Sequence, residues 1–400
     1  MLVGGKRRLP SGSNEVAGSH RLPALLFRGA LASGLGLALV AGSSGPGLAL
    51  VPLAIPVAPP GAVATVGDLG SRPGATRLPV NISDQVSASV DVGTGNLMIS
   101  VTAVSLPGIN GGVPLGVVYN SESTDTVGED VAARWTLSLG GAGSVSTTPS
   151  GVLHTAGDGY SSLFTPVAGS TTAFTAPAGT KADLEKKADG SYILTSRTTA
   201  SVVGFNADGR VKSLADRNGN TTTFAPSTGR VTDITATKGV TGARSAHLSY
   251  DYYTGTLSGI SQTNGAANRS VSFGPDGYGN LSSFTDLAGK TTTFGYTGNR
   301  VTTITPPAGG ATKLTYDASG RVVQIERVNT SAGSPGNSVT RLAYPSATQT
   351  LVAGPNTDPA VPVGSGPRTT YTLNGDLRVT AATDPMGRPG PRPIPGTSTP

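Results

Sequence analysis

A short stretch of the chain, GKTTT from Gly289 to Thr293, contains the residue types with which many proteins bind phosphate. In a phosphate loop, a glycine, a lysine and a hydroxyl residue follow a further glycine five positions earlier, and the backbone amides between them surround the phosphate. Phe284 occupies that earlier position. The sequence therefore does not predict nucleotide binding.

Histidines are the other side chains that could act in catalysis or bind a metal. The chain has no cysteine and three histidines, His20, His154 and His247, which are far apart in sequence. A thiolate or histidine metal cluster is therefore not expected. His154 and His247 could each be a general base, but neither accompanies a G-x-S-x-G or H-E-x-x-H motif. We expect surface or packing roles for both, and we predict no catalytic residue, no metal and no cofactor.

Aspartates recur at positions typical of turns, where a carboxylate either caps backbone amides or serves as a calcium ligand. We favour capping for five aspartates in the repeated segments of the sequence: Asp208, Asp216, Asp276, Asp286 and Asp317. Aromatic residues recur beside these turns. They could form a core or, alternatively, a platform on which sugars stack.

A repeated turn explains the spacing of these residues. Turn glycines, most of them soon followed by arginine and then valine, lie 20, 26, 24, 19 and 22 residues apart, at Gly209, Gly229, Gly255, Gly279, Gly298 and Gly320. The arginines of these turns are Arg210, Arg230, Arg300 and Arg321. Glycine allows positive φ at such turns. The near-identical stretches DRNGNTTTF and DLAGKTTTF, 70 residues apart, belong to the same series.

Each unit of about twenty residues predicts two short strands and two turns. In the unit that ends at Tyr316, alternation puts Thr312, Leu314 and Tyr316 on one face and Lys313 and Thr315 on the other. One hairpin cannot bury its apolar face alone, so copies must stack. We predict an all-β fold with an N-terminal β-rich segment (65–200), an array of stacked hairpins (201–388) and a Pro-rich disordered tail (389–400).

Composition and charge agree with a turn-rich, exported protein. Glycine and proline number 57 and 30, and 36% of residues are apolar. The formal charge is +6, but residues 1–64 contain five basic residues and one acidic residue, so the rest of the chain carries only +2. This small excess does not predict nucleic-acid binding.

The N-terminal 64 residues have the three parts of a secretory signal. Basic residues extend to Arg28, an apolar stretch begins at Gly29, and an A-x-A site lies at Ala62–Ala64. A retained membrane anchor is the alternative, because Ala30–Val57 is long enough to span a bilayer. If the signal is cleaved, no stable membrane insertion is expected. Either interpretation predicts a secreted or envelope-associated protein.

The text YDASGRV, which contains Tyr316, Asp317, Gly320 and Arg321, resembles the YD repeats of the RHS family. Three upstream motifs, TGNL at Thr94, YNS at Tyr119 and WTL at Trp135, are similar to the segment that precedes such repeats in exported bacterial proteins. Asp384–Arg388 resembles both a further repeat start, which we favour, and the motif at which some RHS shells cleave off a toxin.

The resemblance implies a function as a scaffold and a hollow β-shell built from many stacked repeats. By its own spacing this chain has about eight to nine repeats at most, too few to close such a shell, so we predict an open strip of one. We expect a non-enzymatic, exported scaffold related to polymorphic-toxin or wall-associated systems, without a C-terminal toxin domain. An extracellular carbohydrate- or wall-binding module is the alternative, and exposed aromatics in a row would favour it. A hydrolytic activity would require a pair of acids in a pocket. Partners expected from these interpretations are a glycan, the cell wall or the remainder of an RHS shell.

Overall fold

The computed structural model describes residues 69–106, 112–125, 130–227, 229–236, 244–264, 267–331 and 336–390. All regular elements in these ranges are β-strands, so the predicted all-β fold is confirmed. Helices long and apolar enough to cross a membrane are absent from the same ranges. The predicted export signal and most of the predicted disordered tail lie outside the described residues.

The first five strands form an antiparallel sheet of their own, in the order β1 to β5. Its strands are β1 (Arg77–Asn81), β2 (Val86–Asp91), β3 (Leu97–Leu106), β4 (Val113–Asn120) and β5 (Trp135–Leu139). Apolar side chains alternate along β2 and β3, as in a sheet with one buried face. This sheet contains the three upstream motifs identified in the sequence.

The other 22 described strands pair in sequence order into one long antiparallel sheet, which we call the strip. Its first part contains β6 (Ser144–Thr148), β7 (Gly151–Thr155), β8 (Ser161–Pro166), β9 (Ala173–Thr175), β10 (Ala182–Lys186), β11 (Tyr192–Ser196), β12 (Val202–Phe205), β13 (Val211–Ala215), β14 (Thr221–Ser227), β15 (Arg230–Ala236) and β16 (Arg244–Tyr250). The second part contains β17 (Leu257–Asn264), β18 (Ala267–Pro275), β19 (Leu281–Thr285), β20 (Thr291–Thr297), β21 (Arg300–Thr305), β22 (Thr312–Tyr316), β23 (Val322–Arg327), β24 (Ser338–Ser346), β25 (Gln349–Ala353), β26 (Thr369–Leu373) and β27 (Val379–Thr383). The sheet continues across residues 200 and 201 without a break.

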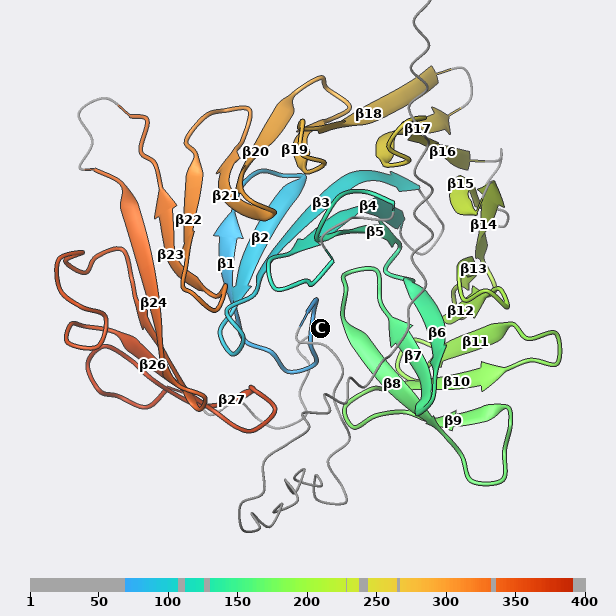
Figure 1. Cartoon of the computed structure of the whole chain (residues 1–400), viewed down its shortest axis with the longest axis horizontal. Helices are drawn as coiled ribbons and strands as arrows, with labels where there is room; N and C mark the ends of the chain where they lie inside the picture. Colours follow the sequence, from blue (N-terminus) through green and yellow to red (C-terminus); the bar gives the residue numbers. More distant parts are fainter. Residues whose placement is uncertain are drawn as a thin grey trace, which may run out of the picture. The chain divides into compact units, whose positions relative to one another are not determined.

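The five-stranded sheet lies inside the curve of the strip, and we call it the inner sheet (Figure 1). One continuous cluster of buried side chains joins them, from Val80 in β1 through Trp135 in β5 to Val352 in β25. Neither sheet could bury this face alone, because each hairpin contributes only a few apolar residues. The two sheets therefore share one core.

The two ends of the strip differ. At its beginning, the amide of Val145 in β6 donates to the carbonyl of Gly209 (2.9 Å), so β6 to β13 curl back on themselves. At its other end, β27 pairs with β26, and the chain then turns so that the Gly390 amide donates to Ala382 (2.8 Å). No described strand register joins β27 to β6, so the strip as a whole is open, as predicted.

Successive turns of the strip alternate between its two edges. We call one of them the seam edge, because its turns face the loops of the five-stranded sheet. It contains the turns at 206–210, 229, 251–256, 276–280, 298–299, 317–321, 347–348 and 374–378. A β-bulge stands just before most of these turns, for example between Thr315 and Tyr316. Such bulges increase local twist and bend the strand, which accounts for the curvature of the strip.

One five-residue turn occurs repeatedly on both edges. In the copy that begins at Asp317, the Asp317 Oδ1 atom accepts from the amides of Ser319 and Arg321, both at 2.9 Å. The same pattern of side-chain caps begins at Asp216, Asp276, Asp286, Asn374 and Asp384. The two near-identical stretches in the sequence are thus two copies of one capped turn, each opening into a strand.

Candidate functional site

Tyrosine hydroxyls connect neighbouring hairpins along the seam edge. Each donates to the backbone carbonyl of a residue one or two positions after the previous seam-edge turn. The four bonds are Tyr250 to Val231 (2.8 Å), Tyr296 to Leu281 (2.6 Å), Tyr316 to Val301 (2.6 Å) and Tyr344 to Val322 (2.8 Å). We call this series the tyrosine ladder. Burial raises the pKa of all four phenols, so they remain protonated donors.

Arginines of the repeated turns lie over these tyrosine rings. The guanidinium of Arg321 lies 4.4 Å from the ring centre of Tyr344, and Arg300 lies 6.0 Å from that of Tyr316. Arg321 also pairs with Asp317 at 2.8 Å. Each arginine thus contacts the next repeat through a cation–π contact, while the aspartate keeps its own turn in shape.

Backbone amides of the seam edge pair with the five-stranded sheet. The Val301 amide donates to the hydroxyl of Tyr119 (3.0 Å), and the Val322 amide donates to the carbonyl of Gly95 (3.0 Å). Trp135 Nε1 donates to the hydroxyl of Tyr296 (3.0 Å). Burial raises the pKa of Tyr119 to about 12. These contacts fix the position of the inner sheet against successive repeats.

The three upstream motifs meet in the loops of the inner sheet. Asn96 Nδ2 donates to Asn120 Oδ1 at 2.8 Å, and the Leu97 amide donates to Ser121 Oγ at 2.9 Å. Trp135 packs against Tyr119, with ring centres 5.3 Å apart. All of these side chains are buried or nearly so. The motifs therefore form one structural junction at the seam.

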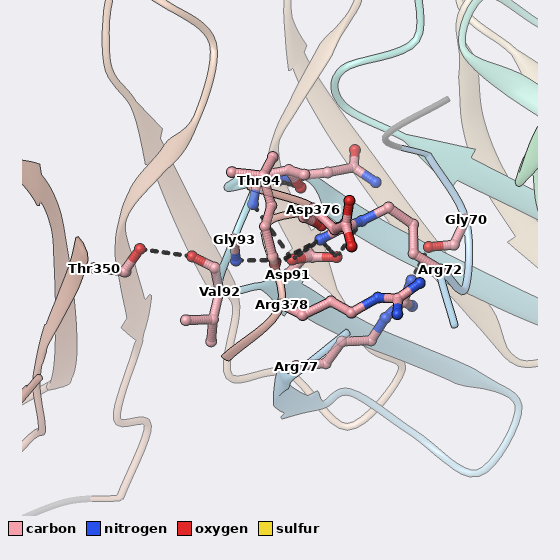
Figure 2. Close-up of polar contacts among 12 residues, drawn as sticks. Gly70, Arg72, Arg77, Asp91, Val92, Gly93, Thr94, Thr350, Asp376 and Arg378 are labelled. Carbon is pink, nitrogen blue, oxygen red and sulfur yellow. Dashed lines mark hydrogen bonds and ion pairs between the residues drawn. The ribbon is translucent and has the colours of Figure 1, made fainter. Parts of the chain in front are cut away.

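A buried ion pair connects the first described residues to the last part of the strip (Figure 2). Arg72 pairs with Asp91 at 3.0 Å, and the two side chains are 8% and 2% exposed. The same guanidinium donates to the carbonyls of Asp376 (3.0 Å) and Leu377 (3.3 Å) in the turn before β27. We call residues 70–72 together with Asp91 the clasp.

The clasp also reaches the beginning of the strip. The amide of Ser71 donates to Asp158 Oδ2 (2.8 Å) in the turn between β7 and β8, and the amide of Gly70 donates to Asn120 Oδ1 (2.9 Å). Nearby, the hydroxyl of Thr350 donates to the carbonyl of Val92 (2.7 Å). Three consecutive residues thus contact the inner sheet and both ends of the strip.

The residues singled out from the repeat all lie on the seam edge. Arg300, Tyr316, Asp317, Gly320 and Arg321 come together there, because a β-carbon on Gly320 would contact the Arg300 guanidinium. Gly209, Arg210, Gly229, Arg230 and Gly298 occupy the equivalent turns, and their glycines have φ between 57° and 86°. Arg72 and Asp91 were not identified from the sequence, because nothing in it indicates a contact over 300 residues.

The remaining candidates for chemistry are separate from one another. His154 lies in β7, where burial lowers its pKa and its Nε2 lies 3.1 Å from the carbonyl of Ala142. His247 is exposed in β16 and pairs with Asp233 at 2.9 Å. Lys290 belongs to a capped turn, where its amide donates to Asp286. Groups of three or more potential metal ligands were not found within the described ranges.

Comparisons with known proteins give matches of low identity and low TM-score. Neither a family model nor a curated protein matches the chain. A Photorhabdus luminescens Tc holotoxin pore with a TccC3 mutation is 14% identical, with a TM-score of 0.31 over 74% of this chain and 18% of that chain. A TcdB2–TccC3 complex with Cdc42 is 12% identical, with a TM-score of 0.27 over 80% of this chain and 21% of that one. The chain spans about a fifth of the length of these solved chains.

Proposed function

We propose that the protein is a non-enzymatic, exported scaffold of the RHS/YD-repeat type, related to polymorphic-toxin or wall-associated systems. One observation carries the proposal: the recurring residues of the repeat either hold their own turn in shape or contact neighbouring repeats and the inner sheet. Tyrosine, aspartate, glycine and arginine each have a structural partner at the seam. When the recurring residues of a repeat are used to stack one hairpin on the next, the stacked array is suited to enclose or present another protein segment or a ligand.

Export is the part of the proposal that rests on the N-terminal sequence. The test is to express the full chain with a C-terminal tag in a bacterial host and to separate medium, envelope and cytosol. We expect the protein in the medium or envelope, beginning near residue 65, and normal growth of the host. Uncleaved protein confined to the cytosol would contradict export, and growth arrest would contradict a purely structural role of the expressed chain.

A carbohydrate- or wall-binding module is the second candidate function. The repeat aromatics do not favour it, since Phe205, Phe224 and Phe294 are at most 4% exposed. Three tyrosines outside the ladder do favour it: Tyr252, Tyr253 and Tyr278 are each more than 90% exposed. Exposed aromatic rings are the side chains to which the C–H faces of sugars bind.

A further inference from the structure

Three exposed tyrosines lie on consecutive turns of the seam edge. Tyr252 and Tyr253 are both 92% exposed, and their rings meet edge to face with centres 5.3 Å apart. Tyr278, in the next turn of that edge, is 91% exposed. The ladder tyrosines use their hydroxyls in the fold, whereas these three rings project from the turns into solvent. Packing therefore does not explain them.

The turns that carry these rings are held in shape by capping. Asp251 Oδ1 accepts from the amides of Tyr253 (3.0 Å) and Thr254 (2.8 Å). Asp276 Oδ1 accepts from the amide of Tyr278 (2.7 Å). Rings on fixed turns lose less conformational entropy on binding than rings on free loops.

An open cavity of about 520 Å³ continues the same edge toward its earlier turns. Its lining includes Asp125, Asp130, Trp135, Thr136, Arg210 and Arg230. Arg230 Nε lies 3.0 Å from Asp130 Oδ1. The turn that carries Tyr252 and Tyr253 borders this cavity, because a β-carbon on Gly255 in the same turn would lie 2.9 Å from the Arg230 guanidinium.

The chemistry of this track favours a neutral ligand rich in hydroxyl groups. The two tyrosine turns add the carboxylates of Asp251 and Asp276, so a polyanion is not attracted. In the cavity lining, two carboxylates and two guanidiniums balance in charge. The same four groups offer acceptors and donors to hydroxyls. Neighbouring seam-edge turns are two strands, or about 10 Å, apart, so the track from Arg230 to Tyr278 is about 20 Å long. That length accommodates several sugar rings.

We propose that Arg230, Tyr252, Tyr253 and Tyr278 form a binding track for an extended, neutral oligosaccharide. The cavity would hold one end of the ligand by hydrogen bonds, and the tyrosines would stack on successive sugars. This inference rests on the second candidate function and assigns its site and the class of its ligand.

The test measures binding of the full chain by calorimetry to cellohexaose, maltohexaose, mannohexaose and galactohexaose, with polyglucuronate as the charged comparison. We expect binding to at least one neutral hexasaccharide. In the triple variant Tyr252→Ala, Tyr253→Ala, Tyr278→Ala we expect that affinity to fall at least tenfold, and in Arg230→Lys to fall several-fold. Met386→Ala, on an exposed turn of the opposite edge, should bind like the wild type.

Circular dichroism melts check that each variant is folded. Equal affinity of the folded triple variant and the wild type would overturn the site while leaving carbohydrate binding in place. Failure of the wild type to bind any of the neutral probes would overturn the proposed ligand class. Preference for polyglucuronate would overturn the argument that the charges of the track do not attract a polyanion.

Discussion

Single hydroxyl groups hold neighbouring repeats together at the seam. The Tyr316 hydroxyl donates to the carbonyl of Val301, a fully buried residue of the preceding repeat. A buried carbonyl that loses its donor costs free energy because water cannot replace the bond. The tyrosine of the repeat is therefore required for its oxygen as well as for its ring.

Removing that oxygen tests the ladder. Tyr316→Phe keeps the ring and should lower the free energy of unfolding by about 1–3 kcal/mol. Tyr253→Phe, whose ring is exposed, should change it by less than about 0.5 kcal/mol. Urea denaturation followed by circular dichroism measures both. If the ladder bonds do not stabilise the fold, both variants will show the same small change in the free energy of unfolding.

His154 should make stability depend on pH. Burial lowers the pKa of His154 in the folded protein, so the unfolded chain binds more protons in the window between the folded and ordinary values. Stability from this group is fully present above the ordinary histidine pKa and is lost as pH falls through the window. Melting temperatures at pH 8 and pH 5.5 should therefore differ more in the wild type than in His154→Gln. A difference in His154→Gln as large as that of the wild type would exclude this cause.

At the scale of one element, the capped turn occurs in two environments. Gly320 at the seam has φ +89°, and an added β-carbon would contact the Arg300 guanidinium and lie 2.8 Å from Glu122 Oε1. Gly289, on the opposite edge, has φ +75° and no neighbour within 4 Å of such a carbon. The two turns share their conformation and differ in what surrounds them.

Alanine at each position separates conformation from packing. Gly289→Ala should cost about 1–2 kcal/mol, the penalty of left-handed backbone for a residue with a β-carbon. Gly320→Ala should cost more, because the side chains of Arg300 and Glu122 must also move. Thermal denaturation of both variants measures the difference. Equal losses would mean that the seam tolerates the methyl group.

Local elements could be predicted from the sequence, whereas contacts between distant ones could not. Asp, Gly and alternating apolar residues indicate a turn and a strand within about ten residues, and the burial of Thr312 and Leu314 with exposed Lys313 and Thr315 confirms the alternation. The sequence does not show that Tyr250 lies in the ladder while Tyr252, two residues later, is exposed. That difference depends on the bulge and on the turn. The contacts of Arg72 with the carbonyls of Asp376 and Leu377 depend on the whole curved sheet.

For the whole molecule, the clasp connects elements that the strip alone leaves apart. Arg72→Ala would leave the Asp91 carboxylate buried without its cation, which typically costs about 3–5 kcal/mol. It would also remove the donors to the turn before β27. We expect a lower free energy of unfolding and faster hydrogen exchange in Thr369–Thr383, measured by mass spectrometry.

An exposed pair of the same type provides the control. Arg388 pairs with Asp384 at 2.8 Å, and its side chain is 72% exposed. Arg388→Ala should therefore have little effect on the free energy of unfolding and leave exchange in β26 unchanged. Exchange that is equally fast in the Arg72 and Arg388 variants would show that the clasp does not hold the end of the strip.

The reach of the clasp has a consequence for the order of folding. Neighbouring hairpins pair within a few tens of residues, so the strip can assemble progressively as the chain becomes available. The inner sheet is made first, yet Arg72 and Leu377 meet across 305 residues and Val92 and Thr350 across 258. Until the last repeats have been synthesised and have folded, part of the apolar face of the inner sheet stays exposed to solvent. A ribosome that stalled midway would thus release a chain that is well paired along its strands and prone to associate through that face.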